Sequence, residues 1–412
     1  MWDYRYREVL EWLLHPHSIE SFLDDFYERE VLHVSRNVPG YFGAYCDLSE
    51  AERVLSEERT AYNLAIYKEG KRVPNEAYTR KVQRHFGRGT PRQDLDVLDP
   101  HRVARLFASG CTLIYDHFGL ASGRISKLMQ RLEAFFGHRV DAALFLTPPN
   151  SSGFRAHWDT SDGFILQIEG RKRWRLCNPT LPLPLESQPH CDEAEGQFLM
   201  NVLMEPGDVL YLPRGTFHQA QAGDEHSLHV AIGLFPVRLV SVLQQALEHA
   251  AKRYLVLRRS AALPHDPTEL QQLLSDVFSE PSLRMTLSRM HSQLRGEAAD
   301  QHGDDTEGLF RQILRHAAGE DELVALRADA LFEVIEVPES TVLRFSGNKV
   351  VLPKAAAAVI AQLRRRPAAS VSDLRAYGPA DEVVSTLIHM GLAVVLGPNS
   401  PSVSGATVTS AT

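Results

Sequence analysis

The 412-residue sequence predicts an α+β protein of several domains, with a strand-rich central part that closes as a barrel or a sandwich. Three observations lead to this prediction. The chain is too long for one compact core, since domains usually span about 100–200 residues. Short apolar runs separated by Pro, Gly, Asn and Ser crowd the region 140–236. Helical periodicity prevails on either side of that region.

Before the central region, the sequence alternates between helix and strand patterns. Ile19, Phe22, Leu23 and Phe26 recur at helical spacing and predict a helix over 18–27. Further helices are expected over 99–108 and 125–136, and strands over 31–34 and 111–115.

The central strands are expected over 140–146, 163–168, 173–177, 208–211 and 228–234. Helices then follow over 240–257, 270–277 and 309–316, with a polar loop over 296–305.

A small separate module is expected near the C-terminus. Gly347-Asn348 lies between two apolar runs, 342–345 and 350–352, which is typical of a β-hairpin. Helical patterns over 355–366, 370–377 and 383–390 and a strand over 393–396 complete a winged-helix-like unit. The predicted division is a domain that contains the strand-rich barrel and an N-terminal α/β elaboration (1–237), a helical region (238–330), the winged-helix-like domain (331–396) and a disordered tail (397–412).

Composition excludes several classes of protein. A net charge of −8 gives no global basic field, so nucleic acid is not expected as the main partner. The four cysteines form no C-x-x-C pair, which argues against a zinc ribbon and is typical of a reducing cytoplasm. The N-terminus has no leader pattern, and no apolar run is long enough for a membrane span.

The strongest chemical signal is the pair His157 and Asp159, directly before an apolar strand. Side chains two positions apart share one face of a strand, so an imidazole and a carboxylate can point to the same place. A second histidine would complete the two-His, one-carboxylate set of non-haem Fe(II) oxygenases. An isolated H-x-D is common, however, and usually marks surface polar residues.

His218 is the best candidate for the second histidine. It follows the string P-G-D-V-L-Y-L-P-R-G-T-F, in which a Gly-Asp turn, a strand and a proline return the chain to the mouth of a barrel. His226 and His229 are its rivals, and either of them could instead be a buried or supporting residue.

A buried cation would hold the distal carboxylate of a 2-oxo diacid co-substrate. Alternation along 171–176 puts Lys172 and Trp174 on one face and Arg173 on the other. If Trp174 faces inward, Lys172 is the anchor, and otherwise Arg173 takes its place. A solvated basic turn is the plain alternative.

These strings, H-W-D-x-x-D-G-F-I-L-Q-I-E-G-R-K-R-W-R-L and P-G-D-V-L-Y-L-P-R-G-T-F-H-Q-A, resemble the JmjC-type ribosomal oxygenases. The segments 107–115 and 146–154 fit the same pattern. The resemblance implies a double-stranded β-helix of the cupin type, a helical dimerisation region and a C-terminal winged-helix domain. It also implies Fe(II) on His157, Asp159 and His218, with 2-oxoglutarate on Lys172.

By the same resemblance, the activity is hydroxylation of arginine or histidine in a ribosomal protein, by a homodimer; the cytoplasmic location is expected from the cysteine usage. Two positions depart from the family pattern: Ala143 stands where an Asn near the co-substrate is common, and Gly233 replaces a Ser. Supporting roles near the metal are conceivable for Gln167 and Trp158, although packing would equally explain both residues.

Two other functions are compatible with the sequence. The altered positions 143 and 233 favour the same chemistry on a biosynthetic peptide or a small molecule. A DNA-binding regulator with a sensory cupin is suggested by residues 340–396, which carry seven Lys or Arg against three acidic residues. A histone demethylase is disfavoured, because no zinc-binding cysteine cluster accompanies the core.

Overall fold

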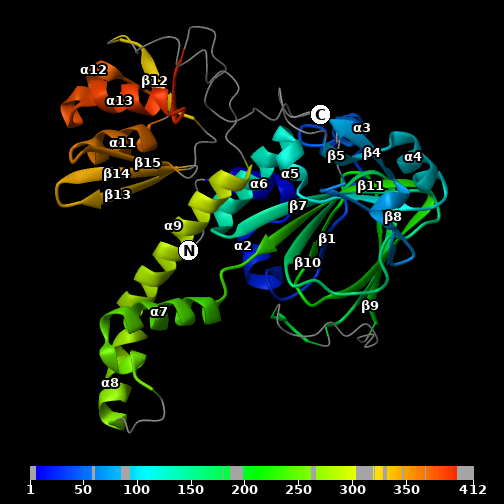
Figure 1. Ribbon diagram of the computed structural model, residues 1–412, viewed down its shortest axis with the longest axis horizontal. Coiled ribbons are helices and arrows are strands. Elements are labelled where there is room, and N and C mark those ends of the chain that lie inside the picture. The colour runs from blue at the N-terminus through cyan, green and yellow to red at the C-terminus, as the bar shows by residue number, and fades with distance from the viewer. Residues whose placement is uncertain are drawn as a thin grey trace. The chain divides into compact units, whose positions relative to one another are not determined.

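The computed structural model describes residues 6–57, 61–84, 93–179, 181–185, 198–260, 266–302, 319, 321–327, 332–345, 348–366 and 368–396. The chain divides into two compact units, 1–236 and 237–412 (Figure 1).

The first unit is built around one large antiparallel sheet (Figure 1). Its strands are β1 (Leu32–Val34), β2 (Leu64–Lys68), β3 (Lys71–Arg72), β4 (Thr79–Arg84), β5 (Gln93–Leu98), β6 (Thr112–Tyr115), β7 (Arg139–Thr147), β8 (Asp162–Cys177), β9 (Phe198–Met204), β10 (Val209–Leu212) and β11 (Phe217–Phe235). The large sheet has the order β1-β10-β8-β11-β7-β6-β2-β3, with β9 on β8, and β4 pairs with β5 apart from it.

The helices of this unit are α1 (Arg7–Leu14), α2 (Ile19–Ser21), the π-helix η2 (Phe22–Phe26), α3 (Leu48–Glu57), the 3-10 helix η3 (Asn75–Ala77), α4 (Pro100–Ala108), α5 (Phe118–Ala121) and α6 (Gly123–Phe136).

The long strands β8 and β11 make the sheet curl into a barrel. They pair with each other along almost their whole lengths, with register shifts between Ala222 and Ser227 and between Leu228 and His229. The first half of β8 also pairs with β10, whereas its second half pairs with β9. Each long strand therefore contributes to two walls, as Figure 1 shows for the green and teal ribbons.

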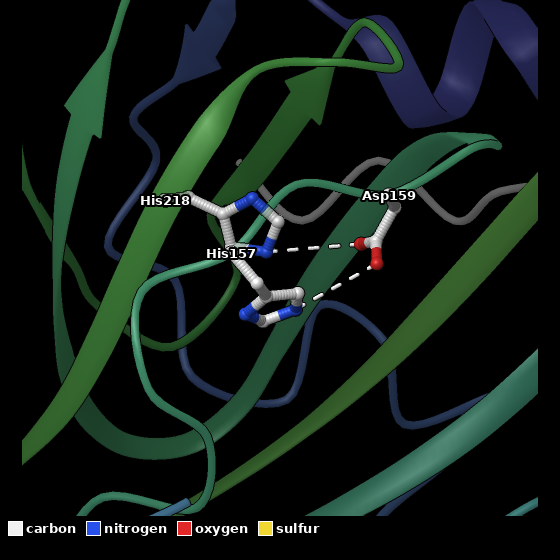
Figure 2. Close-up of side chains that lie close together, drawn as sticks. All are labelled: His157, Asp159 and His218. Carbon is white, nitrogen blue, oxygen red and sulfur yellow. Dashed lines mark ion pairs between the residues drawn. The ribbon is translucent and has the colours of Figure 1, made fainter. Parts of the chain in front are cut away.

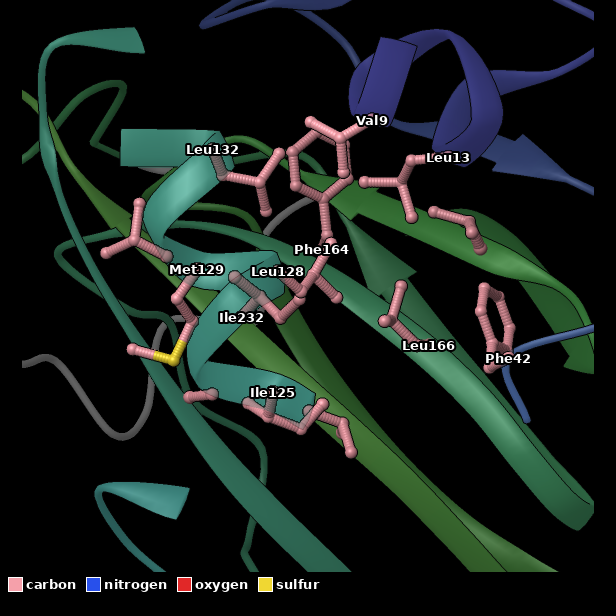
Figure 3. Packing of buried hydrophobic residues seen from close by; sticks show 14 of the residues in the cluster. Val9, Leu13, Phe42, Ile125, Leu128, Met129, Leu132, Phe164, Leu166 and Ile232 are labelled. Atoms are coloured by element: carbon pink, nitrogen blue, oxygen red, sulfur yellow. The ribbon is translucent and has the colours of Figure 1, made fainter. Parts of the chain in front are cut away.

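Strand alternation sorts the side chains onto the two faces of the barrel. Phe164 and Leu166 of β8 point outward into the main hydrophobic core, which α1 and α6 cover (Figure 3). Ile165 points inward and joins a second cluster with Trp174 and Leu176. The inner cluster leaves room on its open side for a cavity, where the predicted site residues lie.

The helix α6 illustrates why these segments fold as they do. Its N-cap Ser122 accepts a hydrogen bond from the Ile125 N–H, and Gly137 ends the helix in the left-handed conformation at φ 66°. Its apolar residues, among them Leu128 and Leu132, lie against the outer face of the sheet (Figure 3).

The second unit contains α7 (Leu239–Arg253), η4 (Leu255–Arg258), α8 (Pro267–Val277), α9 (Glu280–His302), β12 (Leu323–Leu326), β13 (Glu333–Val337), β14 (Ser340–Phe345), β15 (Asn348–Pro353), α11 (Ala356–Arg365), β16 (Ala369–Ser370), α12 (Val371–Leu374), η5 (Arg375–Tyr377), α13 (Ala380–His389) and β17 (Ala393–Val395). Its strands form two three-stranded sheets, β16-β12-β17 and β13-β14-β15.

The hairpin expected around Gly347-Asn348 is present as β14 and β15, which pair from Ser340↔Pro353 to Phe345↔Asn348. The strand β12 precedes residue 331, the expected start of the C-terminal module, yet it pairs with both β16 and β17 of that module. Among the described helices, none has the length and apolar character needed to cross a membrane.

Two expectations about individual elements are wrong, and several strands were missed. The runs 163–168 and 173–177 belong to the single strand β8, because Gly170 bends the chain at φ 61° without ending the strand. The expected loop 296–305 is helical as far as His302, since its Ala, Glu and Gln residues are good helix formers despite their polarity. The strands β2 to β5 and β9 were not predicted.

Two further expectations lie outside the described residues: the helix over 309–316 and the disordered tail over 397–412.

The bend at Gly170 gives a test of the barrel. A Cβ at this position would overlap the carbonyl oxygen of His226 on the paired strand. Gly170→Ala should therefore lower the free energy of unfolding by about 2–4 kcal/mol, from backbone strain and overpacking together. Chemical denaturation measures the change. Gly223→Ala, on the paired strand β11 with open space around its Cβ, is the control and should have little effect. Equal effects of the two substitutions would contradict the proposed role of the bend.

Candidate metal centre and its cavity

Two backbone connections bring the predicted ligands together. The N–H and C=O groups of His157 and His218 are hydrogen-bonded in both directions, at 3.0 and 2.7 Å. Asp159 lies in the loop before β8, and its carbonyl oxygen accepts a hydrogen bond from the Gly215 N–H at 2.9 Å. The expectation that His157 and Asp159 share a regular strand is wrong, because only His157 is strand-paired and only through an isolated bridge.

The three side chains converge on one point (Figure 2). The Nε2 atoms of His157 and His218 lie 3.6 and 3.7 Å from the two carboxylate oxygens of Asp159. One ligand atom from each residue can be chosen so that all three lie within 4.8 Å of one another. Within the described part of the chain, this is the group of His, Cys, Asp and Glu residues that could hold a metal ion.

Main-chain carbonyl groups orient both imidazoles. The Nδ1 atom of His157 is 2.8 Å from the carbonyl oxygen of Arg155, and that of His218 is 2.9 Å from the carbonyl oxygen of Thr216. A carbonyl oxygen can only accept, so the proton must reside on Nδ1 and Nε2 is left with a free lone pair. Burial, reinforced by the neighbouring His157, lowers the pKa of His218, which favours the neutral form that binds metals.

A buried ionic clamp supports the segment that carries His218. Arg214 donates a hydrogen bond from its backbone N–H to Asp162 at 2.9 Å, and from its guanidinium to Asp162 at 2.7 Å and to Glu28 at 2.6 Å. Burial raises the pKa of Asp162, and the charge of Arg214 opposes that effect. The clamp connects the segment before His218 and the start of β8 with Glu28 in the N-terminal part of the chain.

The metal-ligand group opens into a cavity inside the barrel. Its aromatic and apolar walls come from β7, β8, β11 and the loop before His157, and its polar groups include Lys172 and His229; the lining residues are Thr112, Phe145, Gly153, Phe154, Arg155, His157, Asp159, Ile165, Lys172, Trp174, His218, Ala220, His229 and Ala231.

Lys172 is the cation of this cavity. Its side chain is 3% exposed, and its ammonium group donates a hydrogen bond to the Thr147 hydroxyl at 3.1 Å. Burial alone lowers the pKa of Lys172 to about 7, because no carboxylate among the described residues compensates its charge. A buried cation without an anionic partner is costly, so the arrangement favours the binding of an anion.

The sequence left two choices open: Lys172 or Arg173 as the cation, and His218, His226 or His229 as the second histidine. The directions of these side chains distinguish between them. Trp174 is buried in the barrel together with Lys172, whereas Arg173 is exposed on the opposite face. His226 lies at the bend, with its Nε2 3.6 Å from a carboxylate oxygen of Glu169, away from the metal-ligand group. His229 lines the cavity but does not belong to that group either.

The residues considered as supporting groups have structural roles. The Gln167 side-chain amide donates hydrogen bonds to the carbonyl oxygens of Glu169 and Gly170, at 2.9 and 3.0 Å, and thereby fixes the bend in β8. Trp158 is buried in a small cluster with Cys177 and Phe217.

The two departures from the family pattern lie on the inner face of the barrel. Ala143 is opposite Ala231, which lines the cavity, and Gly233 is opposite Asp141. A Cβ at Gly233 would lie 3.4 Å from the Ser161 hydroxyl oxygen and 3.2 Å from the Phe235 ring. This wall therefore carries fewer polar side chains than the family pattern implies.

Thr147 and Phe145 were not predicted as site residues. Both lie on the inner face of β7, where Phe145 lines the cavity and Thr147 bonds to Lys172. Period-two alternation on β7 would have placed them on one face, but it would not have shown which face is internal.

Sequence comparison finds a known domain in the part of the chain that carries these features. Residues 115–241 match the JmjC domain family. The cupin-type fold expected from the sequence is confirmed.

More particularly, the chain is similar to ribosomal oxygenases and their relatives. It is 31% identical over 271 residues to the bifunctional lysine-specific demethylase and histidyl-hydroxylase NO66 of Drosophila mojavensis, covering 62% of this chain and 29% of the relative. Ribosomal oxygenase 1 of Danio rerio is 28% identical, with coverage of 63% and 47%. The matched region thus spans less than half of these curated relatives.

Among solved structures, the ribosomal oxygenase YcfD of Escherichia coli shares the fold, with a TM-score of 0.53 and 15% identity over 92% of this chain and 98% of that one. A second structure of YcfD, in complex with cobalt and 2-oxoglutarate, gives a TM-score of 0.52 at 15% identity, covering 93% and 99%. The resemblance to the JmjC-type ribosomal oxygenases is confirmed by the sequence relatives, and the solved structures share the fold.

The buried Lys172 gives a prediction about stability. Below pH 7 this lysine is protonated in both the folded and the unfolded protein, so the cost of burying the charge is present in full. Between pH 7 and about 10.4, the ordinary lysine pKa, the unfolded state binds more protons and the cost declines as pH rises.

Lys172→Met should therefore stabilise the protein free of metal and 2-oxo acid, by about 1–4 kcal/mol near pH 6.5. The gain should shrink towards pH 9.5. Thermal unfolding in carboxylate-free buffer measures it, with the exposed Arg173→Met as the control. A destabilised Lys172→Met variant at pH 6.5 would show that Lys172 is already neutralised by the protein.

Proposed function

We propose that this protein is an Fe(II)- and 2-oxoglutarate-dependent oxygenase that hydroxylates a side chain of a protein or peptide. The observation that carries this proposal is a set of two imidazoles and one carboxylate, oriented towards one point, in the same cavity as the uncompensated cation Lys172. A 2-oxo diacid has the matching chemistry, with one end that chelates a metal and a distal carboxylate that requires a cation.

His157, Asp159 and His218 would hold the iron, since their donor set is the one typical of non-haem Fe(II) oxygenases. When bound, the iron supplies the activation of O₂ that is coupled to oxidative decarboxylation of the 2-oxo acid. The remaining work belongs to the chain itself. Lys172 binds the distal carboxylate and sets the position of the co-substrate.

The cavity walls keep water away from the reacting centre. Phe154 lies edge-on to His157, with ring centroids 5.3 Å apart, and Phe145 lies edge-on to Phe154 at 6.1 Å. On the other side, Trp174 lies 5.7 Å from His218. Aromatic walls of this kind exclude bulk solvent and strengthen the ion pair between Lys172 and a bound carboxylate.

The proposed substrate is a histidine or an arginine of a ribosomal protein. The support is the similarity to proteins named as histidyl-hydroxylase and ribosomal oxygenase. Hydroxylation of a smaller peptide or metabolite is the second candidate, and it is favoured by Ala143 and Gly233, where the inner wall lacks two polar groups of the family pattern.

We also propose that the chain is a cytoplasmic homodimer with its helical region (238–330) at the interface. In the sequence, a winged-helix-like domain (331–396) follows this region. Exposed apolar side chains on the described part of that region support a partner surface: Leu239, Val240, Tyr254, Leu255 and Met285. Light scattering coupled to gel filtration tests this proposal, and a monomer at micromolar concentration would contradict it.

The metal-ligand assignment is tested by anaerobic titration with Fe(II) and 2-oxoglutarate. The wild-type protein should develop the visible charge-transfer band of the metal–2-oxo acid chelate. His157→Ala and His218→Ala should abolish the band, because two protein ligands do not hold the ion. His226→Ala is the matched control and should retain it. A band that persists in His157→Ala would refute the assignment.

The substrate proposal is tested by incubating the protein with ribosomal proteins, Fe(II), 2-oxoglutarate and O₂. Peptide mass spectrometry should find one added oxygen on a histidine or an arginine, and none with the His218→Ala variant. A methyl-lysine peptide is the comparison substrate, since the Drosophila relative is named for both reactions. Hydroxylation of a small peptide or metabolite without any oxidised ribosomal peptide would instead favour the second candidate.

A further inference from the structure

His229 is a second buried polar group in the cavity, and neither the metal set nor the ionic clamp uses it. It lies on β11 and lines the cavity together with Lys172, and its side chain is almost completely buried. Its Nδ1 atom has no hydrogen-bond partner among the described residues. An unpartnered buried polar atom in a folded protein calls for an explanation, because most such atoms are satisfied.

Aromatic neighbours hold the ring of His229 in one orientation. It is stacked on Phe145, with ring centroids 4.7 Å apart and planes 8° apart. Trp174 meets it edge-on at 5.7 Å and 77°. The imidazole therefore cannot turn to find a partner elsewhere without losing both contacts.

The charge state of the ring is fixed by the same surroundings. Burial, followed by the charge of Lys172, holds the pKa of His229 well below its usual range, so the imidazole is neutral. A neutral imidazole carries one N–H donor. The cavity thus offers an ammonium group and a neutral donor close enough to interact electrostatically, and no carboxylate among the residues that line it apart from Asp159.

We propose that His229 donates a hydrogen bond to the same distal carboxylate that Lys172 binds, and so helps to select a 2-oxo diacid over a 2-oxo monoacid. This inference rests on the proposed function. A carboxylate has two oxygens and about four lone-pair sites, so it can accept from Lys172 and His229 together. The ligand then satisfies two polar groups that the protein leaves incomplete, and Phe145 and Trp174 position the donor.

The test compares two ligands that differ only at the distal end. Anaerobic titration of the Fe(II) protein with 2-oxoglutarate and with 2-oxopentanoate, each followed through its chelate band, gives two dissociation constants. His229→Phe keeps the ring and its stacking but removes the donor. It should weaken 2-oxoglutarate binding about 10- to 100-fold, as expected for the loss of a hydrogen bond to a charged group. The binding of 2-oxopentanoate should not change.

His229→Asn and His229→Gln restore an N–H donor at positions that approximate the two ring nitrogens, and at least one should bind 2-oxoglutarate more tightly than His229→Phe. Equal weakening of both ligands by His229→Phe, no weakening of either, or no recovery by Asn and Gln would overturn the inference. Thermal unfolding of each variant shows that it is folded. If the Phe variant is not, the Asn and Gln variants are compared with the wild-type protein: at least one should keep the preference for 2-oxoglutarate over 2-oxopentanoate, and loss of that preference in both would overturn the inference.

Failure of the inference and failure of the proposed function give different results. If the wild-type protein forms no chelate with 2-oxoglutarate, the proposed function fails, and the inference fails with it. If the wild-type protein binds 2-oxoglutarate and Lys172→Met weakens that binding while His229→Phe does not, only the inference fails.

Discussion

The pairing of β8 with β11 is the constraint on which the rest of the first unit depends. These two strands remain hydrogen-bonded through a bend, and each contributes to two walls of the barrel. The inward side chains of one pair of strands therefore supply Lys172, Trp174, His218 and His229. Gly170 makes the bend possible for two reasons. Its backbone is in the left-handed conformation, and the carbonyl oxygen of His226 lies where a Cβ atom would have to be. The cavity is thus a consequence of strand continuity rather than of loops that close over an open sheet.

Local patterns in the sequence predicted the parts of the site that lie within one strand or one turn. Alternation correctly put Lys172 with Trp174 and apart from Arg173, and the turn before His218 singled it out from His226 and His229. What the sequence did not show was long-range pairing. Glu169-Gly170 was interpreted as a turn between two strands, because the same dipeptide is compatible with a turn and with a bend inside one continuous strand. The roles of Thr147 and Phe145 depend on which face of β7 is internal, and only the closed barrel decides that.

The site is built at the expense of the stability of the ligand-free fold. Lys172 is buried with one neutral hydroxyl as its hydrogen-bond partner, and His229 is buried with Nδ1 unsatisfied. Both are unfavourable in an empty barrel, where apolar residues would pack without a penalty. The outer core compensates, since Phe164, Leu166 and the apolar residues of α6 belong to one large hydrophobic core on the other side of the same sheet (Figure 3). The outer face of the sheet stabilises the protein, and the inner face lines the cavity that can bind a ligand.

The hydrogen bonds that orient the two imidazoles have a consequence for how this protein family can change. His157 and His218 are held by the main-chain carbonyl groups of Arg155 and Thr216, not by side chains. Any residue at those two positions presents the same carbonyl oxygen. Arg155 is exposed and lines the cavity, so its side chain can be replaced during evolution without disturbing the tautomer of His157, two residues away. Under the proposed function, the side chains that meet the substrate at the rim of the cavity can therefore change while the orientation of the two imidazoles at its centre is kept.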